Sequence, residues 1–484
     1  MNSDKGIRLH PSIIIEQSVN VLVILFVLFI FAYDSTSYSI YIFLLIIVAI
    51  FVSYVIWKKT YIFFKDDELV IERNLLIKSK KTIPYHKIAS INVERKVLNR
   101  IFGTSALKIN INSGVNALAP EAVLTFKEDL ALKIRAELSN KLFDHEYSKE
   151  ADDKIESLVH FTFKDIFIHS ICGLPTGQSV VGLFFLLYAL VSVFFQSSGG
   201  VIVPLLIFII TDIIPPIFGV VKYYNFRMYR QGDSIHIQHG MIQTYRSSFK
   251  ITRINAVCIR QTLLSRLIKK ASIELEVVGL SGSDGKKPTV CLLTNVNKIP
   301  SILDNLLPEF VYEHATMKQP PAAKYPILLG YSLVAIVAVI ITTLSGYSLI
   351  DYLLAQERIV ETEILMYIPV AISALIVLLL LTCAHLSYNV KEFDMGGNLF
   401  TFVNGIVDRE TTIINYDRVQ VINIASSRIA HHFGLAKCKI SLLSSMGERT
   451  ITSGYFPESE LSKIAERIIE RISTGEYDYR LNGI

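Results

Sequence analysis

Six apolar runs, arranged in three pairs, constrain the fold of this chain more than any other feature of its sequence. A helix of about 20 apolar residues is long enough to cross the hydrocarbon core of a bilayer. The composition agrees, because 51% of the 484 residues are hydrophobic and only 19% are charged, against about 25% charged residues in an ordinary soluble domain. We therefore predict a polytopic α-helical membrane protein with six spans in three hairpins. The predicted spans cover residues 19–33, 39–57, 178–195, 200–221, 325–344 and 363–386.

The charged residues around these runs predict the side of the membrane on which each polar segment lies. Lysine and arginine flank the pairs, as at Lys58, Lys222 and Lys391, whereas the turns inside the first and third pairs carry acids such as Asp34 and Asp351. By the positive-inside rule, the polar segments and both termini are expected to be cytoplasmic. No small-residue cleavage site follows the first run, so we predict a span there and not a signal peptide. The expected location is the cell (plasma) membrane, as a multi-pass protein.

The polar segments between the pairs are copies of one another. Residues 75–109, 241–275 and 406–440 align without a gap, so the period is 166 residues and then 165. Self-similarity at a nearly fixed period is the signature of a repeated structural unit, here two spans followed by one polar domain. The second copy departs from the other two at Lys269, where the first and third copies have Gly103 and Gly434. Among the shared columns are Lys87, Arg253 and Arg418; Ile88, Ile254 and Val419; and Leu98, Leu264 and Ile429.

Each polar domain has the periodicity of strands followed by one helix. Apolar and polar residues alternate in the copies, and Gly240 and Gly405 lie where two strands would turn. Helical segments at about 121–143, 298–312 and 457–472 close the repeats. The apolar stripe of the last one is Leu461, Ile464, Ile468 and Ile469. We predict three α+β domains, each a small antiparallel barrel or sandwich with a C-terminal helix.

The predicted boundaries follow from the spans and the repeats. Residues 1–57 hold the N-terminal segment and spans 1 and 2, 151–222 a linker and spans 3 and 4, and 319–386 a linker and spans 5 and 6. The three α+β domains cover 58–150, 223–318 and 387–484.

Two motifs carry a resemblance to a known family. They are TIPYHKIASINVERKVLNRIFG at Thr82–Gly103, with its two internal copies, and RLHP at Arg8–Pro11 ahead of the first apolar run. The chain resembles the bacterial PH-like domain (type 2) membrane protein family, the YdbS/YdbT-like group, and three repeats fit its longer, YdbT-like members. The resemblance implies PH-like domains and a role in envelope stress or resistance to membrane-active peptides. It also implies a protein partner, a shorter single-domain family member.

Basic residues in the copies are the candidates for binding lipid headgroups or a partner. Anionic headgroups attract lysine and arginine by about 1 kcal/mol apiece near the surface, and the spans would hold the domains there. The alternative is an ordinary solvated surface that obeys the positive-inside rule. The net charge of +5 is too small for a dedicated nucleic-acid binder, so no nucleic acid is expected. The candidates are Lys78, Lys80, Lys81, Lys87, Arg95, Lys96, Arg100, Arg253, Arg260, Arg266, Lys269, Lys270 and Arg418.

Asp212 is the one clear ionisable residue inside a predicted span. Intramembrane carboxylates are costly and often functional, which makes an exporter of small solutes or peptides the alternative function. Pro215 and Pro216 offer a structural explanation, because they would break the helix and Asp212 would cap the freed amides. We favour the structural explanation, since the other spans supply no second ionisable group at mid-depth.

Motifs for catalysis and for metals are missing from the sequence. It contains no HExxH, GxSxG or GxGxxG after a strand, and the five cysteines form no CxxC pair, so they are expected to be reduced thiols. The glycine-rich stretch 279–287 is predicted to be a hairpin tip, because its spacing departs from a phosphate-binding loop. His431 and His432 are adjacent, and on a strand they would face opposite sides. We predict no enzyme activity, no cofactor and no metal site.

The predicted function is that of an integral membrane scaffold. It would display three cytoplasmic PH-like modules that bind membrane lipids or partner proteins, with the exporter as the alternative.

Overall fold

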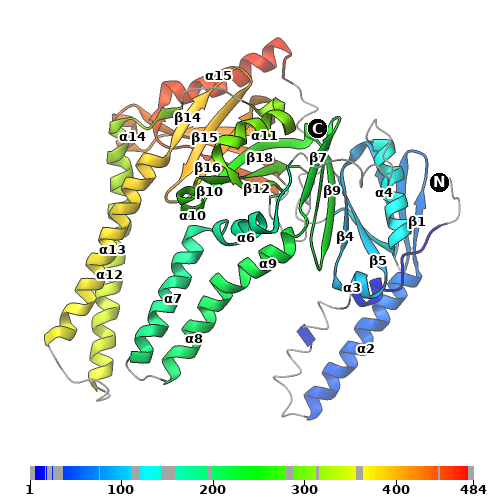
Figure 1. Cartoon of the computed structure of the whole chain (residues 1–484), viewed down its shortest axis with the longest axis horizontal. Helices are drawn as coiled ribbons and strands as arrows, with labels where there is room; N and C mark the ends of the chain where they lie inside the picture. The colour runs from blue at the N-terminus through cyan, green and yellow to red at the C-terminus, as the bar shows by residue number, and fades with distance from the viewer. Residues whose placement is uncertain are drawn as a thin grey trace.

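The computed structural model describes most of the chain. It covers residues 6–16, 18, 24–25, 36–75, 77–111, 120–142, 159–194, 198–278, 287–311, 316–355, 363–444 and 447–477. Most of the first predicted span and the 279–286 tip lie outside the described residues. In Figure 1 the long apolar helices extend on one side of the molecule and the strands lie on the other.

Four described helices are long and apolar enough to cross a membrane: Tyr41–Lys58, Val201–Tyr223, Pro321–Tyr352 and Met366–Val390. A fifth span is counted if α6 and α7, which meet at 74°, are taken as one broken span. The helices α7 and α8 pack together, as do α12 and α13. Six spans in three hairpins stay a prediction. The bounds are α2 Thr36–Lys58, α6 Phe163–Cys172, α7 Thr176–Phe194, α8 Ser198–Phe208, a π-helical turn η2 Ile209–Ile213, α9 Ile214–Tyr223, α12 Lys324–Ala355 and α13 Glu363–Val390.

Each repeat folds as two three-stranded antiparallel meanders followed by a helix. A one-turn 3₁₀ helix joins the two meanders, and a short α-helix follows the first strand of the second meander. Repeat 1 comprises β1 Thr60–Phe64, β2 Glu68–Asn74, β3 Lys78–Pro84, η1 Tyr85–Lys87, β4 Ile88–Arg95, α3 Val97–Ile101, β5 Thr104–Ile111, β6 Ala122–Lys127 and α4 Glu128–Leu142. Repeat 2 comprises β7 Arg227–Gln231, β8 Ser234–His239, β9 Thr244–Lys250, η3 Ile251–Arg253, β10 Ile254–Gln261, α10 Leu263–Leu267, β11 Lys270–Val277, β12 Thr289–Asn295, η4 Val296–Lys298, α11 Ile299–Leu306 and η5 Pro308–Phe310.

Repeat 3 keeps this order and adds short strands. It comprises β13 Met317–Lys318, η6 Pro321–Ala323, β14 Glu392–Met395, β15 Leu399–Gly405, β16 Arg409–Asn415, η7 Tyr416–Arg418, β17 Val419–Ala425, α14 Arg428–His432, β18 Leu435–Ser444, β19 Gly447–Thr452, β20 Phe456–Pro457 and α15 Glu458–Thr474.

The sheets run across the repeat boundaries. The second meander of repeat 1 pairs with the first meander of repeat 2 through β4 and β9, which makes a six-stranded sheet. In the same way β10 pairs with β16, and the resulting sheet has seven strands. The predicted domain boundaries divide the sequence by repeat, but the hydrogen-bonded sheets join each repeat to the next. Figure 1 shows the green strands β9 and β10 beside strands of the neighbouring repeats.

An apolar core lies beneath the C-terminal helix of each repeat. Ile413 of repeat 3 packs in the core of repeat 2, and Ala256 of repeat 2 packs in the core of repeat 3. In α15 the residues Leu461, Ile464 and Ile468 are buried, as their spacing of three and four residues predicts. Ile469, which was placed in the same stripe, is 64% exposed. That assignment was wrong, because the stripe seated on the sheet is narrower than four apolar positions.

One further local prediction needed correction. The segment 121–143 begins as the strand β6 and becomes helical only at Glu128. His431 and His432 lie at the end of α14 and not on a strand, because Ser427 caps a helical turn there by accepting a hydrogen bond from the Ala430 amide.

Candidate functional site

The three short helices α3, α10 and α14 lie next to the segments that enter the apolar helices. In repeat 1 the Asn99 amide donates a hydrogen bond of 2.6 Å to Glu16, which precedes the first predicted span. In repeat 3 the ring of Phe433 stacks on Tyr325 at the start of α12, with ring centroids 5.0 Å apart. Figure 1 shows α3 and α10 at the level where the strands meet the apolar helices.

Large apolar side chains are exposed on all three short helices. Ile101 is 70% exposed in repeat 1, Leu267 is 72% exposed in repeat 2 and Phe433 is 40% exposed in repeat 3. Apolar side chains that face a lipid surface, with cations beside them, are typical of segments that lie in the membrane interface. The neighbouring exposed cations are Lys96, Arg100, Arg266 and Lys269.

A cleft of about 320 Å³ lies where α12 and α13 meet repeat 3. The helices contribute apolar walls, and Lys391 and Lys437 contribute cations at its polar end. The described residues that line this Lys391 cleft include no acid. Its full lining is Pro326, Ile327, Gly330, Tyr331, Val334, Leu380, Ser387, Lys391, Lys437 and Tyr455.

The electrostatics of the Lys391 cleft favour an anion. Burial lowers the pKa of Lys391, and the positive charge of Lys437 lowers it further. The Lys437 ammonium lies 4.2 Å from the centre of the Tyr455 ring. This cation–π interaction attracts the ammonium more weakly than a carboxylate would. An anion placed between the two lysines would therefore relieve their repulsion. Since apolar helix surface continues from this point, the cleft suits an anion attached to an acyl chain.

A larger cleft of about 550 Å³ adjoins it and shares Tyr331, Ser387 and Lys391. Its arginines, unlike Lys391 and Lys437, have carboxylate partners. Arg260 lies 3.8 Å from Glu274, and Arg449 lies 2.6 Å from Glu410. These ion pairs make the larger cleft a weaker anion site than the Lys391 cleft.

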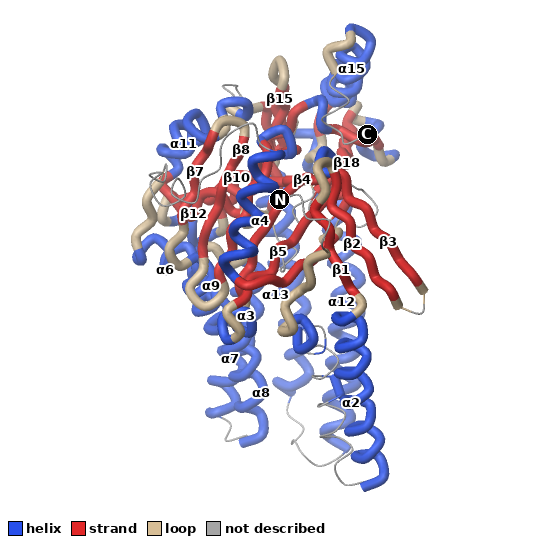
Figure 2. The backbone as a smooth tube through the Cα atoms, turned by 90° about the vertical axis from the view of Figure 1, so that its right-hand side faces the viewer, coloured by secondary structure: helices blue, strands red, loops and turns tan. Residues whose placement is uncertain are grey.

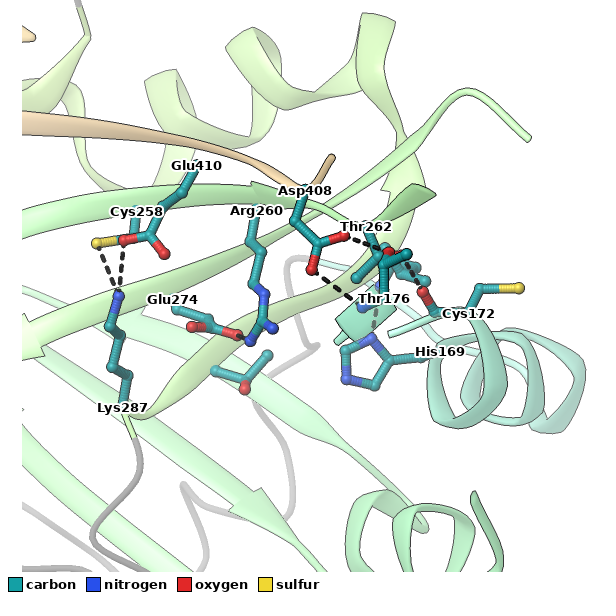
Figure 3. Close-up of polar contacts among 12 residues, drawn as sticks. His169, Cys172, Thr176, Cys258, Arg260, Thr262, Glu274, Lys287, Asp408 and Glu410 are labelled. Carbon is teal, nitrogen blue, oxygen red and sulfur yellow. Dashed lines mark hydrogen bonds and ion pairs between the residues drawn. The ribbon is translucent and has the colours of Figure 1, made fainter. Parts of the chain in front are cut away.

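The larger cleft borders a partly buried ionic cluster at the joint between repeats 2 and 3. Lys287 lies 2.9 Å from Glu410 and 3.2 Å from Glu276, and Arg449 contacts both carboxylates. Figure 3 shows Lys287 directed at Glu410 and at the Cys258 sulfur. The two cations and two carboxylates balance in charge, and the ion pairs connect Glu276 on β11 with Glu410 on β16 and Arg449 on β19.

Asp408, at the turn before β16, ties an apolar helix of repeat 2 to repeat 3. Its carboxylate accepts hydrogen bonds from the hydroxyl and the amide of Thr176, the first residue of α7, and from the amide of Leu263 on α10. Thr262 adds a hydrogen bond to the Cys172 carbonyl at the end of α6 (Figure 3). The bend between α6 and α7 is thus fixed by contacts from both repeats.

The structure separates the predicted cations into groups. Lys78, Lys80 and Lys81 lie on the exposed strand β3, where Lys81 pairs with Glu121 at 2.6 Å. Several others are engaged in ion pairs or hydrogen bonds: Arg95 with Glu128, Arg260 with Glu274, Lys270 with Asp165, and Arg266 with the Val407 carbonyl.

The equivalent residues Lys87, Arg253 and Arg418 lie in the 3₁₀ turns, away from the short helices. Lys87 is exposed, burial lowers the pKa of Arg253, and Arg418 is only 5% exposed. The structure therefore places Lys96 and Arg100 at the two ends of α3, and Arg266 and Lys269 at the C-terminal end of α10. It does not gather all thirteen cations in one surface.

Asp212 does not cap the amides of a broken helix, so the predicted cap was wrong, although the helix departs from regular α geometry at this residue. The helix continues through the π-helical turn η2, and α9 starts with Pro215 and Pro216 in its first turn and no side-chain cap. Because the helix is continuous, each proline removes an amide donor to the preceding turn, and the side-chain amide of Gln178 on α7 donates a 2.6 Å hydrogen bond to the Thr211 carbonyl there. The Asp212 carboxylate instead accepts a 2.7 Å hydrogen bond from the Thr211 hydroxyl. It packs so closely on Gly182 of α7 that a Cβ there would overlap with it.

The chain offers little that is reactive in the described part. Burial raises the pKa of Cys258 to about 11 and those of Cys291 and Cys438 to about 12, so these thiols stay protonated at neutral pH. No group of three or more His, Cys, Asp or Glu residues among those described could hold a metal ion.

Sequence reasoning missed Lys391 and Lys437 as a pair. Lys391 follows the last apolar run, which was a signal for orientation only, and Lys437 aligns with Ala106 and Ser272 in the other copies. The available signal for the site was Lys437, a cation that the third repeat has and the other two lack.

The family model of the bacterial PH domain matches the chain three times, at residues 20–142, 181–309 and 325–472. The chain therefore belongs to the bacterial PH domain family. It is similar to the UPF0699 transmembrane protein YdbT of Bacillus subtilis (strain 168), with 22% identity over 401 residues, or 77% of each chain. No solved structure matches it. With its apolar helices, the chain is a membrane protein that carries three bacterial PH-like repeats.

Proposed function

We propose that this protein is an integral membrane scaffold whose PH-like repeats bind anionic phospholipid headgroups on the cytoplasmic leaflet. The observation that carries the proposal is the Lys391 cleft. Its described lining includes two lysines and no acidic residue, and it continues into an apolar helix surface. The short helices support it, because each repeat exposes apolar side chains beside the apolar helices. The proposal includes a role in envelope stress or in resistance to membrane-active peptides, which is supported by the family resemblance alone.

Two lysines near a lipid surface contribute about 1 kcal/mol each toward an anionic headgroup. Removing both charges should therefore weaken binding by about 30-fold, since 1.4 kcal/mol is tenfold. The full-length protein, stripped of lipid in detergent, is titrated with phosphatidylglycerol and with phosphatidylcholine, and bound lipid is counted by native mass spectrometry.

The test variant is the double substitution Lys391→Gln and Lys437→Gln. The matched control is Lys463→Gln on α15, where the lysine is exposed and pairs with Glu460. We expect the wild type and the control to prefer phosphatidylglycerol, and the double variant to lose this preference. Equal affinity of the wild type for the two lipids would refute the proposal.

An exporter is the second candidate function. The observation in its favour is the π-helical turn at Asp212, because such turns are frequent at functional sites. Asp212→Asn would abolish solute or peptide export in cells while the amount of protein in the membrane stays unchanged. Unchanged export by this variant would remove the candidate.

A further inference from the structure

Two joints between repeats follow one rule of strand pairing. The first strand of the second meander, β4 or β10, pairs antiparallel with the last strand of the first meander in the following repeat, β9 or β16. The register is also the same: Ser90 faces Phe249 in one joint, and the equivalent Ala256 faces Ile414 in the other. The joint is therefore a repeated structural feature of this chain.

Two strands of the same kind end their sheets without such a neighbour. The strand β17 is the equivalent of β4 and β10, and it ends the sheet β17-β18-β19. The strand β3 is the equivalent of β9 and β16, and it ends the sheet β1-β2-β3. Figure 2 shows β3 at the outer edge of its sheet. These two edge strands are thus of the two kinds that pair with each other in the internal joints.

The side chains of β17 and β3 are more exposed than their equivalents on the paired strands of the internal joints. Val421 on β17 is 55% exposed, whereas its equivalents Ser90 and Ala256 are 1% and 0% exposed. The first five residues of β3 are exposed, whereas those of β9 and β16 are at least half-buried. Both end strands thus present a surface that the internal joints cover.

The composition of β17 also favours pairing. Soluble proteins protect edge strands with charges, proline or bulges. The strand VQVINIA of β17 has no charged residue and no proline. Its irregularity between Val419 and Val421 recurs in β4 and β10, which pair in spite of it. It is long, exposed and apolar enough to accept another strand.

The lysines of β3 do not prevent such a joint, because cations occupy the same columns inside the existing ones. Arg246 on β9 is the equivalent of Lys80 and faces Val93. Arg409 on β16 is the equivalent of Lys78 and faces Gln261.

We propose that β17 of one copy of this chain pairs with β3 of a second copy, in the register of the internal joints. This register places Ala425 opposite Ser79 and Asn423 opposite Lys81. The contact is head-to-tail, so it generates an extended array or a closed ring and not a twofold dimer. Because the helices of all repeats extend to one side in Figure 1, the same operation keeps the second copy in the same membrane. The inference does not depend on lipid binding.

Cysteine crosslinking in membranes tests the predicted register. Two full-length chains with different tags are co-expressed, one carrying Ser79→Cys and the other Ala425→Cys, both at exposed positions. We expect a disulfide between the two tags, because directly opposed residues of paired strands bring their Cα atoms within bonding reach. A chain with both substitutions should give a ladder of oligomers. Two Ser79→Cys chains, and the wild type with its native cysteines, are the controls.

A pair that is out of register keeps the proposal falsifiable. Thr82 lies three residues along β3 from Ser79, the residue expected to face Ala425. The pair Thr82→Cys and Ala425→Cys should therefore not crosslink. Equal yield from this pair, no disulfide from the in-register pair, or a disulfide from Ala425→Cys to a different protein would each overturn the proposal.

Charge substitution supplies an independent measurement. Asn423 is exposed and would face Lys81 of the second copy. We expect Asn423→Lys to lower the crosslinking yield by about fivefold through like-charge repulsion, and Asn423→Glu to preserve or raise it. A similar yield from both variants would contradict the proposed register.

Discussion

Lys269 holds a left-handed backbone conformation that the other two repeats assign to glycine. Its φ angle is +54°, against +62° at Gly103 and +65° at Gly434. A Cβ added at either glycine would meet no atom within 4 Å, so the backbone conformation alone decides the cost. A side chain in this region costs about 1–2 kcal/mol, and the extra freedom of glycine in the unfolded chain offsets about 0.4–1 kcal/mol. Lys269→Gly should therefore stabilise the turn by about 0.5–1 kcal/mol.

Hydrogen exchange of the full-length protein measures this change locally. The amides at the start of β11 should exchange about two- to fivefold more slowly in Lys269→Gly. Lys269→Ala, which removes the charge but keeps the Cβ, should leave the rate unchanged. Gly103→Lys and Gly434→Lys should accelerate exchange in their own repeats. Equal protection from the alanine and glycine variants would show that charge, and not φ, is the cause, and would refute the reasoning.

Two further predictions concern repeat 3. Gly405 has a φ of +133°, and a Cβ there would overlap with the Asp408 carbonyl, so Gly405→Ala should lower the yield of folded protein, while Gly397→Ala, with open space around it, should not. Arg471 is buried and forms two 2.8 Å hydrogen bonds with Asp417, while its other acidic partner, the exposed Glu476, lies 3.6 Å away. Asp417→Asn should destabilise the protein by about 3 kcal/mol, because Glu476 compensates the Arg471 charge only weakly. The double variant Asp417→Asn, Arg471→Leu should recover part of this loss in thermal unfolding, and no recovery would show that the hydrogen bonds, and not the buried charge, account for it.

Local features of the fold were predictable where the pattern and the backbone agree. Gly240 and Gly405 lie at strand turns as predicted, since their positive φ angles suit glycine. The stripe of α15 was predictable to within one residue, Ile469, because periodicity indicates a face but not its width. The start of α4 was not predictable, because the strand β6 continues directly into the helix without a turn residue between them.

The candidate site was harder to predict than the fold. Lys391 and Lys437 lie on different elements and meet only because β18 packs beside the end of α13. Conversely, Arg418 was a candidate by its column and is buried in repeat 3. Sequence columns show which residues are equivalent, but exposure depends on what packs over each column.

The sequence by itself determined the membrane character, the three repeats and the alternation of strands and helix within each, because hydropathy and periodicity are local properties of a chain. Only the tertiary structure decided that the sheets join one repeat to the next, since strand pairing is made by backbone groups that every residue carries. For the same reason only the structure left β3 and β17 as complementary unpaired edges. The repeated sequence specifies the fold of each repeat, and the packing of neighbouring repeats decides which edge strands are left without a paired strand.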